Sequence, residues 1–258
     1  MDAGSSVCAI AVSKDGKWVV SGSARLVTVW NAQNHSKVTE WKAHDRWVCR
    51  VDVSPDGTRI ATGSDDNTLC IWSLSTAGER LLGALKHDHW VLAVKFSPNG
   101  RLIATAACDG NIRVYDSRTG GLIEFPSKAN SNSGHSLTWA TDNDLLFVSS
   151  SDGNVIALEV STRITLSKWA IHSSKNATCI ALPNNGGFVA TSAGSSISFW
   201  DIGTREQIGS VIEHTQDVVT MGISTYHDLV VRGDKTITIW RLCDILPSRY
   251  FDNVRLSA

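Results

Sequence analysis

Histidine, aspartate and hydroxyl residues recur along the chain at spacings that could build a catalytic site. His44 and Asp66 flank Thr62, and the same residue types return in the same order one repeat later. A histidine, an acid and a hydroxyl are the residue types of an acyl-transfer triad, in which one activated nucleophile works in an open site. A catalytic site needs one such set, whereas this set recurs in full and partial copies. The recurrence favours a structural role.

A second run of reactive residues, His87-Asp88-His89, could suggest a metal site. His87 already belongs to the recurring set, so only His89 is free, and one histidine cannot hold a zinc ion. The six cysteines include no Cys-x-x-Cys pair and read as free thiols in a reducing compartment. We therefore predict no metal and no cofactor.

The recurring set follows an internal repeat, which is the strongest signal in the sequence. Short apolar runs end at six evenly spaced positions, in steps of 42, 43, 43, 42 and 40 residues. These closing positions are Trp30, Trp72, Tyr115, Leu158, Trp200 and Trp240. Upstream of them stand turn sequences of one type, "SKDG" at Ser13, "SPDG" at Ser54 and "SPNG" at Ser97.

Each repeat holds four short runs rich in β-branched and aromatic residues, separated by Gly, Asp, Asn, Pro and Ser. Four strands in about 40 residues, repeated along the chain, predict a blade of a β-propeller. The predicted fold class is therefore all-β: a propeller of six four-stranded antiparallel blades, forming one domain over residues 1–258. The predicted blades span approximately 4–41, 44–85, 87–126, 133–170, 175–212 and 216–257.

These features resemble the WD-repeat β-propeller family, over almost the whole chain. The marks are Trp200-Asp201, the SPDG-type turns, and histidines 28 residues before a closing aromatic. The resemblance implies a buried hydrogen-bonded tetrad of histidine, Ser/Thr, Asp and the closing Trp. The second repeat carries the whole set, the third has tyrosine for tryptophan, and the sixth has Val230 at the hydroxyl position. The implied members are His44, Thr62, Asp66 and Trp72; His87, Thr105, Asp109 and Tyr115; and His214, Asp234 and Trp240.

The other three repeats carry the set incompletely. The fifth keeps His172, Thr191 and Trp200, the fourth keeps Asp152 alone, and the first is expected to have Trp30 and to lack the rest.

The chain shows no spare N-terminal strand that could complete the last blade, because Val7 already begins a first strand. We therefore expect residues Tyr250 to Leu256 to form the outermost strand of the last blade. The alternative is an incomplete seven-bladed propeller, in which the outer faces of the first and sixth blades would be exposed and apolar.

Composition narrows the function. The formal net charge of −1, from 24 Lys and Arg against 25 Asp and Glu, argues against nucleic-acid binding. No apolar run reaches the length of a membrane span, and the N-terminus lacks the pattern of a signal peptide. We expect an intracellular protein, cytoplasmic or nuclear. The sequence leaves open its oligomeric state and whether it belongs to a larger polypeptide or complex.

A propeller is a scaffold, so function must come from its exposed residues. The family resemblance points to a top face, where the first strand of each blade begins, as a surface for a protein or peptide partner. Trp47 and Trp90 each follow a recurring histidine by three residues, and tryptophan is typical of interaction hot spots. The predicted partner-binding residues are Arg46, Trp47, Asp65, His89, Trp90, His135, Lys175 and Asp217.

The predicted function is therefore a non-catalytic scaffold for protein–protein or protein–peptide interaction. When the repeats are aligned with one another, further positions expected on the top face are Cys49, Leu92, Cys108, Ser133 and Ser151. The alternative is a propeller enzyme, or a binder of a small ligand or glycan, at the mouth of the central channel. Such a site usually needs converging acids, and the predicted face offers only Asp65 and Asp217.

Overall fold

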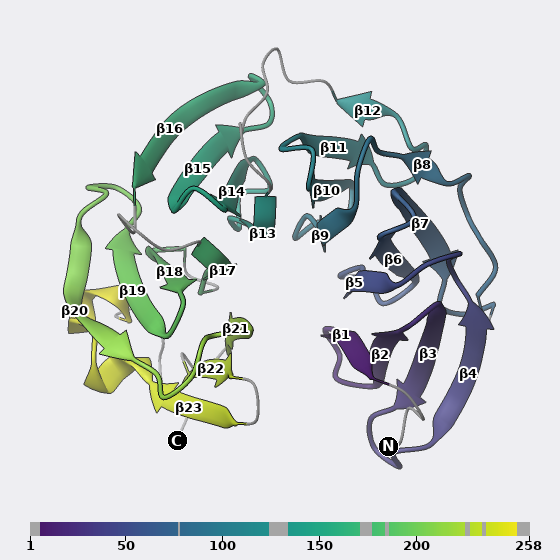
Figure 1. Cartoon of the computed structure of the whole chain (residues 1–258), viewed down its shortest axis with the longest axis horizontal. Coiled ribbons are helices and arrows are strands. Elements are labelled where there is room, and N and C mark those ends of the chain that lie inside the picture. Colours follow the sequence, from purple (N-terminus) through teal and green to yellow (C-terminus); the bar gives the residue numbers. More distant parts are fainter. Residues whose placement is uncertain are drawn as a thin grey trace. The chain divides into compact units, whose positions relative to one another are not determined.

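The computed structural model describes residues 6–76, 78–123, 134–170, 177–183, 186–224, 228–233 and 236–251. In this part of the chain the regular structure is β-strand, apart from two short 3-10 helices. The strands form six antiparallel sheets that follow one another in chain order (Figure 1). The chain divides into two compact units, Met1–Gly134 and His135–Ala258. The assignment of one domain over residues 1–258 stays a prediction.

The first unit holds three four-stranded sheets. In the first sheet the strands are β1 (Val7–Val12), β2 (Trp18–Ser23), β3 (Leu26–Asn31) and β4 (Lys37–Lys42). In the second they are β5 (Val48–Val53), β6 (Arg59–Ser64), β7 (Thr68–Ser73) and β8 (Leu85–Lys86). In the third they are β9 (Val91–Phe96), β10 (Leu102–Ala107), β11 (Ile112–Asp116) and β12 (Leu122–Ile123).

The second unit holds the other three sheets. The fourth sheet has β13 (Gly134–Trp139), β14 (Leu145–Ser150), β15 (Asn154–Glu159) and β16 (Ile164–Ala170). The fifth has β17 (Ala177–Ala181), β18 (Phe188–Ala193), β19 (Ser196–Asp201) and β20 (Gln207–Glu213). The sixth has β21 (Thr220–Ile223), β22 (Asp228–Arg232) and β23 (Ile237–Arg241). The two 3-10 helices are η1 (Leu242–Asp244) and η2 (Ser248–Tyr250).

The predicted fold class, an all-β propeller of six antiparallel blades, is confirmed. One detail differs, because the sixth sheet has three strands within the described residues, where four were expected.

The end sheets each carry exposed apolar residues on one face. On the sixth sheet Ile237 and Ile239 are 71% and 64% exposed, and on the first sheet Ile10 and Val12 are also exposed. The alternative of an incomplete seven-bladed propeller stays a prediction.

The turn between the first two strands of a sheet explains why the SPDG-type sequences recur. In the second sheet Ser54 Oγ donates to Asp56 Oδ1 at 2.5 Å, and the backbone N–H of Arg59 donates to Ser54 Oγ at 2.9 Å. Gly57 has a φ of +68°, a left-handed conformation that glycine adopts without strain. The same side-chain bonds are made by Ser13 with Asp15 and by Ser97 with Asn99.

Small residues let neighbouring sheets of the first unit pack closely. A Cβ added to Gly63 of β6 would lie 2.7 Å from side-chain atoms of both Val91 and Val94 of the third sheet. Leu69 and Ile71 of β7 are fully buried in the same cluster as these valines. Because every blade must bury both faces, the sequence repeats the same apolar pattern.

The predicted closing strand from Tyr250 to Leu256 is wrong where it can be compared with the structure. Tyr250 ends the 3-10 helix η2, and residues 252–258 lie outside the described part of the chain. The Tyr250 ring packs edge-on against Phe188 of β18, with ring centroids 5.7 Å apart. Its hydroxyl donates to Asp201 Oδ2 at 2.6 Å. The buried Tyr250 ring therefore anchors the 3-10 helix Ser248–Tyr250 on the fifth sheet.

Candidate functional site

The second sheet brings His44, Thr62, Asp66 and Trp72 together around one hydroxyl group. Thr62 Oγ1, on β6, lies 2.7 Å from His44 Nε2 and accepts a hydrogen bond of 2.9 Å from Trp72 Nε1 on β7. The other ring nitrogen of His44, Nδ1, lies 2.9 Å from Asp66 Oδ2. His44, Thr62 and Trp72 are all buried.

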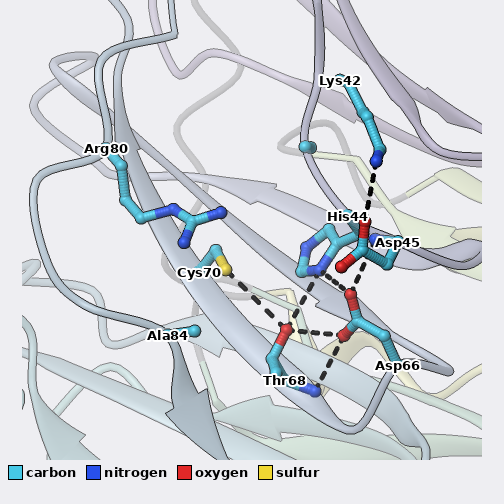
Figure 2. A pocket seen from close by; sticks show the side chains of 9 residues that line it. Lys42, His44, Asp45, Asp66, Thr68, Cys70, Arg80 and Ala84 are labelled. Carbon is cyan, nitrogen blue, oxygen red and sulfur yellow. Dashed lines mark hydrogen bonds and ion pairs between the residues drawn. The ribbon is translucent and has the colours of Figure 1, made fainter.

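The chemistry of the partners sets the direction of these bonds. An ionised carboxylate can only accept, so His44 Nδ1 carries the proton and donates to Asp66 (Figure 2). Nε2 then accepts from the Thr62 hydroxyl. Burial opposes ionisation of Asp66, but hydrogen bonds from His44 and Thr68 outweigh it and hold the pKa of Asp66 below its usual value. Every polar atom at the centre of this cluster is therefore satisfied.

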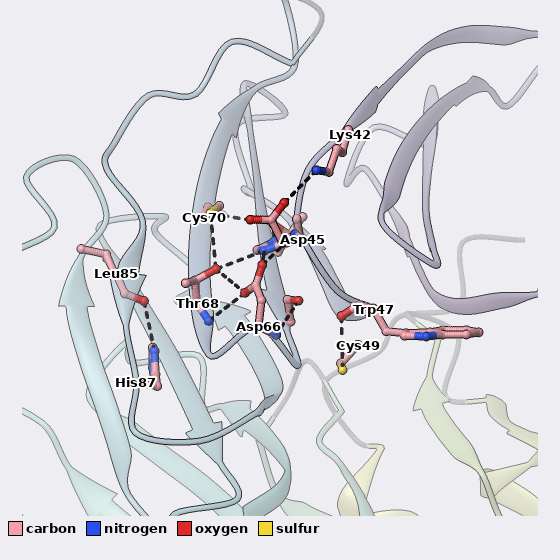
Figure 3. A network of polar contacts seen from close by, with 12 residues as sticks. Lys42, Asp45, Trp47, Cys49, Asp66, Thr68, Cys70, Leu85 and His87 are labelled. Atoms are coloured by element: carbon pink, nitrogen blue, oxygen red, sulfur yellow. Dashed lines mark hydrogen bonds and ion pairs between the residues drawn. The ribbon is translucent and has the colours of Figure 1, made fainter.

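The third sheet builds a different cluster around His87. His87 Nε2 lies 2.9 Å from Thr105 Oγ1 and 3.4 Å from the Tyr115 hydroxyl, as the alignment implies. Its Nδ1, however, lies 3.2 Å from the carbonyl oxygen of Leu85 (Figure 3). The expected placement of Asp109 on this histidine is wrong, because Arg113 Nη1 donates to Asp109 Oδ2 at 2.9 Å.

The missing carboxylate changes the acid–base behaviour of the third sheet. Burial is the largest cause that lowers the pKa of His87 to about 4, and the positive charge of Arg113 acts in the same direction. A neutral imidazole that donates to a carbonyl and accepts from a hydroxyl fits this environment. His87 is therefore a buried neutral side chain at physiological pH.

In the sixth sheet His214 contacts a hydroxyl group that the comparison of the repeats did not predict. His214 Nε2 lies 3.1 Å from Thr238 Oγ1 on β23, and the His214 and Trp240 rings meet edge-on at 5.8 Å. The assignment of Val230 to the hydroxyl position is wrong by one residue. Leu229 pairs with Trp240 and Val231 pairs with Thr238, so the buried Val231 occupies that position. Asp234 lies outside the described residues.

The first sheet also has a hydroxyl partner that the sequence interpretation missed. Trp30 Nε1 donates to Ser21 Oγ at 2.9 Å, so the expectation that this repeat has only its tryptophan is wrong. Trp200 Nε1 donates to Thr191 Oγ1 at 3.0 Å in the fifth sheet. A hydroxyl nine or ten residues before the closing aromatic is the signal that would have found Ser21.

The fourth and fifth sheets show the remaining members of the set. Asp152 accepts hydrogen bonds from Ser150 Oγ and from Lys168 Nζ. His172 lies outside the described residues.

The Thr62 hydroxyl of the second sheet is not open to a substrate, as acyl transfer would require. Thr62 is fully buried, and its hydroxyl hydrogen points to His44 within the protein. Hydrogen-bonded polar clusters of this kind tie one strand hairpin to the loop beside it. Among the described residues, no group of three or more His, Cys, Asp or Glu side chains is arranged to hold a metal ion.

Trp47 and Trp90 occupy equivalent positions at the start of neighbouring sheets. The Trp47 carbonyl accepts from the backbone N–H of Asp65 at 3.1 Å, and the Trp90 carbonyl accepts from that of Cys108 at 3.0 Å. The two side chains are 49% and 43% exposed. Trp47 extends away from the second sheet (Figure 3). Two large aromatic surfaces therefore stand at the edge where β5 and β9 begin.

The polar neighbours of these tryptophans are in part exposed and in part buried. Arg46 and His89 are exposed, and the His89 ring contacts that of Trp90 at 5.2 Å. Asp65 Oδ1 is buried and has no hydrogen-bond partner among the described residues. Burial, aided by the negative charge of Asp65, raises the pKa of Cys49 to about 11, so this thiol is not a nucleophile at neutral pH.

The other predicted partner-binding residues belong to the second unit. Asp217 is exposed, whereas Lys175 and the side chain of His135 lie outside the described part of the chain. The aromatic ring contacts of the described residues do not join Trp47 to Trp90, so the two indoles are not stacked. In that same part of the chain, no helix is long and apolar enough to cross a membrane.

Comparison with known proteins finds local similarity to several relatives. The chain is 40% identical over 77 residues to "Anaphase-promoting complex subunit cdh1" of Dictyostelium discoideum, which covers 29% of this chain and 10% of that protein. It is 43% identical over 54 residues to "Apoptotic protease-activating factor 1" of Homo sapiens, covering 21% and 4%. It is 44% identical over 64 residues to "Small ribosomal subunit protein RACK1y" of Oryza sativa subsp. japonica, covering 24% and 19%. These alignments span less than a fifth of each relative.

The family comparison covers more of the chain. The WD40 model, described as "WD domain, G-beta repeat", matches residues 2–31, 35–73, 80–116 and 165–201, which is more than half of the sequence. These matches include the closing positions of four of the repeats, and the described sheets have the strand order expected of such repeats. The chain belongs to the WD-repeat family.

Proposed function

We propose that this chain is a non-catalytic intracellular scaffold that binds a protein or peptide partner at the Trp47/Trp90 patch. The patch is defined as Arg46, Trp47, Asp65, His89 and Trp90. The observation that carries the proposal is the half-exposure of two tryptophans at equivalent positions of neighbouring sheets. Exposed tryptophan is unusual on a monomer surface and is enriched at binding hot spots.

The energetics of the two indoles fit such a role. A tryptophan side chain buries roughly 150–250 Å² on complete burial, so two half-exposed indoles offer a partner a large apolar contact. The tryptophan carbonyls are fixed by backbone bonds to Asp65 and Cys108. Little conformational freedom of the backbone is therefore lost on binding, which favours affinity.

The polar residues of the patch can orient a partner. Asp65 places a carboxylate beside Trp47, although its Oδ1 is buried and out of a partner's reach. Arg46 and His89 are exposed beside the indoles and can donate to a partner's carbonyl or carboxylate groups. The apolar anchors with polar groups at their edge match the anatomy of protein interfaces.

The relatives support assembly with other macromolecules. The name of one relative places it in the anaphase-promoting complex, and the name of another places it in the small ribosomal subunit. The net charge of −1 is low for a protein that follows a phosphate backbone, which favours a protein partner over a nucleic acid.

A capture experiment with matched variants tests the proposal. The parent chain and a Trp47→Ala/Trp90→Ala double variant are immobilised, and partners from the source cell are compared by quantitative mass spectrometry. We expect the double variant to bind the principal partner at least about 30-fold more weakly, since one hot-spot residue contributes ~2 kcal/mol or more.

The control is a Leu81→Ala/Leu122→Ala double variant. Leu81 and Leu122 are 42% and 46% exposed, so this variant removes a comparable pair of exposed apolar side chains from the same unit. It should bind as the parent chain does. Equal loss in both double variants, or full binding by the tryptophan variant, would contradict the proposal.

A further inference from the structure

A hollow of about 230 Å³ lies beside the buried cluster of the second sheet. Its walls are formed within the first unit by Lys42, Ala43, His44, Asp45, Asp66, Thr68, Cys70, Arg80 and Ala84 (Figure 2). This volume is below the ~300 Å³ at which pockets for small-molecule ligands usually begin. The hollow is suited to a single side chain.

The third sheet shows what fills this place in its own repeat. Arg113 stands on β11 opposite Thr105, in the register that Cys70 has on β7 opposite Thr62. Its guanidinium donates to Asp109 Oδ2 at 2.9 Å and to Asp88 Oδ2 at 2.7 Å. The Arg113 side chain is 15% exposed, so two carboxylates hold a largely buried guanidinium.

The second sheet keeps both carboxylates and has no arginine at this position. Asp45 follows His44 as Asp88 follows His87, and Asp66 lies four residues after its threonine as Asp109 does. The backbone N–H of Asp45 donates to Asp66 Oδ2 at 3.1 Å, which holds the two acids near each other. Cys70 is too short to reach them and is 2% exposed at the wall of the hollow.

We propose that this hollow binds an arginine side chain of a partner protein, with its guanidinium donating to Asp45 in place of Lys42 and lying beside the charge of Asp66, whose oxygens already accept from His44, Asp45 and Thr68. A planar guanidinium can donate two parallel hydrogen bonds to one carboxylate, whereas an ammonium acts as a single point charge. The site is distinct from the Trp47/Trp90 patch and does not depend on it.

Two cations of the chain shape the access to the site. Lys42 Nζ contacts Asp45 Oδ1 at 2.7 Å, but the two side chains are 58% and 86% exposed, so this pair is weak and exchanges readily. Arg80 lies over the Trp72 ring, its guanidinium carbon 4.8 Å from the ring centroid. Arg80 thus forms the opposite wall, and its charge directs an incoming guanidinium to the side of the two aspartates.

The ionisation of the two acids supports the same choice of ligand. Hydrogen bonding and attraction by Lys42 lower the pKa of Asp45. Burial opposes ionisation of Asp66, but its hydrogen bonds with His44 and Thr68 lower its pKa as well. Both carboxylates are therefore charged at neutral pH.

The test uses the capped peptide acetyl-Gly-Arg-Gly-amide and its citrulline analogue, which has the same shape without the charge. Titration is followed by isothermal calorimetry and by amide shifts around Asp66. The arginine peptide should bind to one site, at least about tenfold more tightly than the citrulline peptide. Cys70→Arg should reduce binding by at least about tenfold, because it supplies the guanidinium from the chain itself, whereas Leu122→Ala, at an exposed residue outside the hollow, should bind as the parent does.

Further variants keep the proposal falsifiable if Cys70→Arg does not fold. Asp45→Asn changes an exposed side chain and should weaken arginine binding severalfold. Trp47→Ala/Trp90→Ala should leave peptide binding unchanged, so failure of this proposal and failure of the proposed function are distinguishable. Equal binding of the arginine and citrulline peptides, or undiminished binding by Cys70→Arg and Asp45→Asn, would overturn the proposal.

Discussion

Thr62→Val is expected to lower the free energy of unfolding by about 3 kcal/mol. The substitution keeps the shape of the side chain but removes the hydroxyl that accepts from Trp72 Nε1 and donates to His44 Nε2. Both partners are buried, and an unsatisfied buried polar group costs ~1–3 kcal/mol each. Denaturant titration, with the slope m unchanged between the two proteins, measures this loss.

The matched control for this prediction is Thr105→Val in the third sheet. His87 Nε2 there lies within 3.4 Å of the Tyr115 hydroxyl as well as close to Thr105, so one partner remains after the substitution. The expected loss is about 1 kcal/mol. Equal losses at Thr62 and Thr105, or no loss at Thr62, would show that the hydroxyl of the second sheet does not organise its cluster.

Acidification from pH 6.5 to pH 4 is expected to remove about 3 kcal/mol of stability through His87 alone. Burial lowers the pKa of His87 from 6.5 to about 4 in the folded chain. Above pH 6.5 the residue is neutral in both states, so its full contribution is present. Between these two pKa values the unfolded chain binds the proton and the folded chain does not. The free energy of unfolding therefore decreases as the pH is lowered, by up to ~1.4 kcal/mol per pH unit.

The measurement compares the pH dependence of unfolding in the parent chain and in His87→Gln. Glutamine can still hydrogen-bond to Thr105 but does not titrate, so the variant should have a flatter profile between pH 6.5 and 4. Asp66 contributes only at more acidic pH, because its pKa is lowered from a model-peptide value of 3.8. Parallel profiles of the two proteins in this window would contradict the neutral, buried state of His87.

The fold could be predicted because the closing residues of the repeats recur at nearly constant spacing along the sequence. Closing aromatics such as Trp72 and Tyr115 pack against a histidine in their own sheet, so residue type and spacing report the same contact. The turn at Ser54 and Asp56 is equally local, since its hydrogen bonds join residues within five positions. Features that recur at a fixed spacing, or that join residues a few positions apart, are therefore the ones that a single sequence reveals.

The predictions from the sequence were wrong where a one-residue difference in hairpin length, or a contact between distant residues, decides the structure. The hairpin of the sixth sheet places Val231, nine residues before Trp240, where the second sheet has Thr62 ten residues before Trp72. Arg113 draws Asp109 away from His87, because a charged donor competes with a neutral ring. Tyr250 packs on Phe188, which is distant in sequence, so no local pattern indicated its 3-10 helix.

The arginine-sized hollow was not visible in the sequence for a related reason. Cys70 reads as a core residue of β7, and the comparison that gives it meaning is with Arg113 in the same register of the next sheet. The exposure of Trp47 and Trp90 likewise required the structure, because tryptophan at the start of a strand can be buried or exposed.

Hydrogen exchange on the captured complex tests the central claim, partner binding at the Trp47/Trp90 patch, most directly. The account predicts slower exchange on binding at the amides of Asp65 and Cys108, which donate to the two tryptophan carbonyls. The turns at Gly57 and Gly100, at the other ends of β5 and β9, should exchange as in the free chain. Protection confined to those turns, with Asp65 and Cys108 unchanged, would contradict the account.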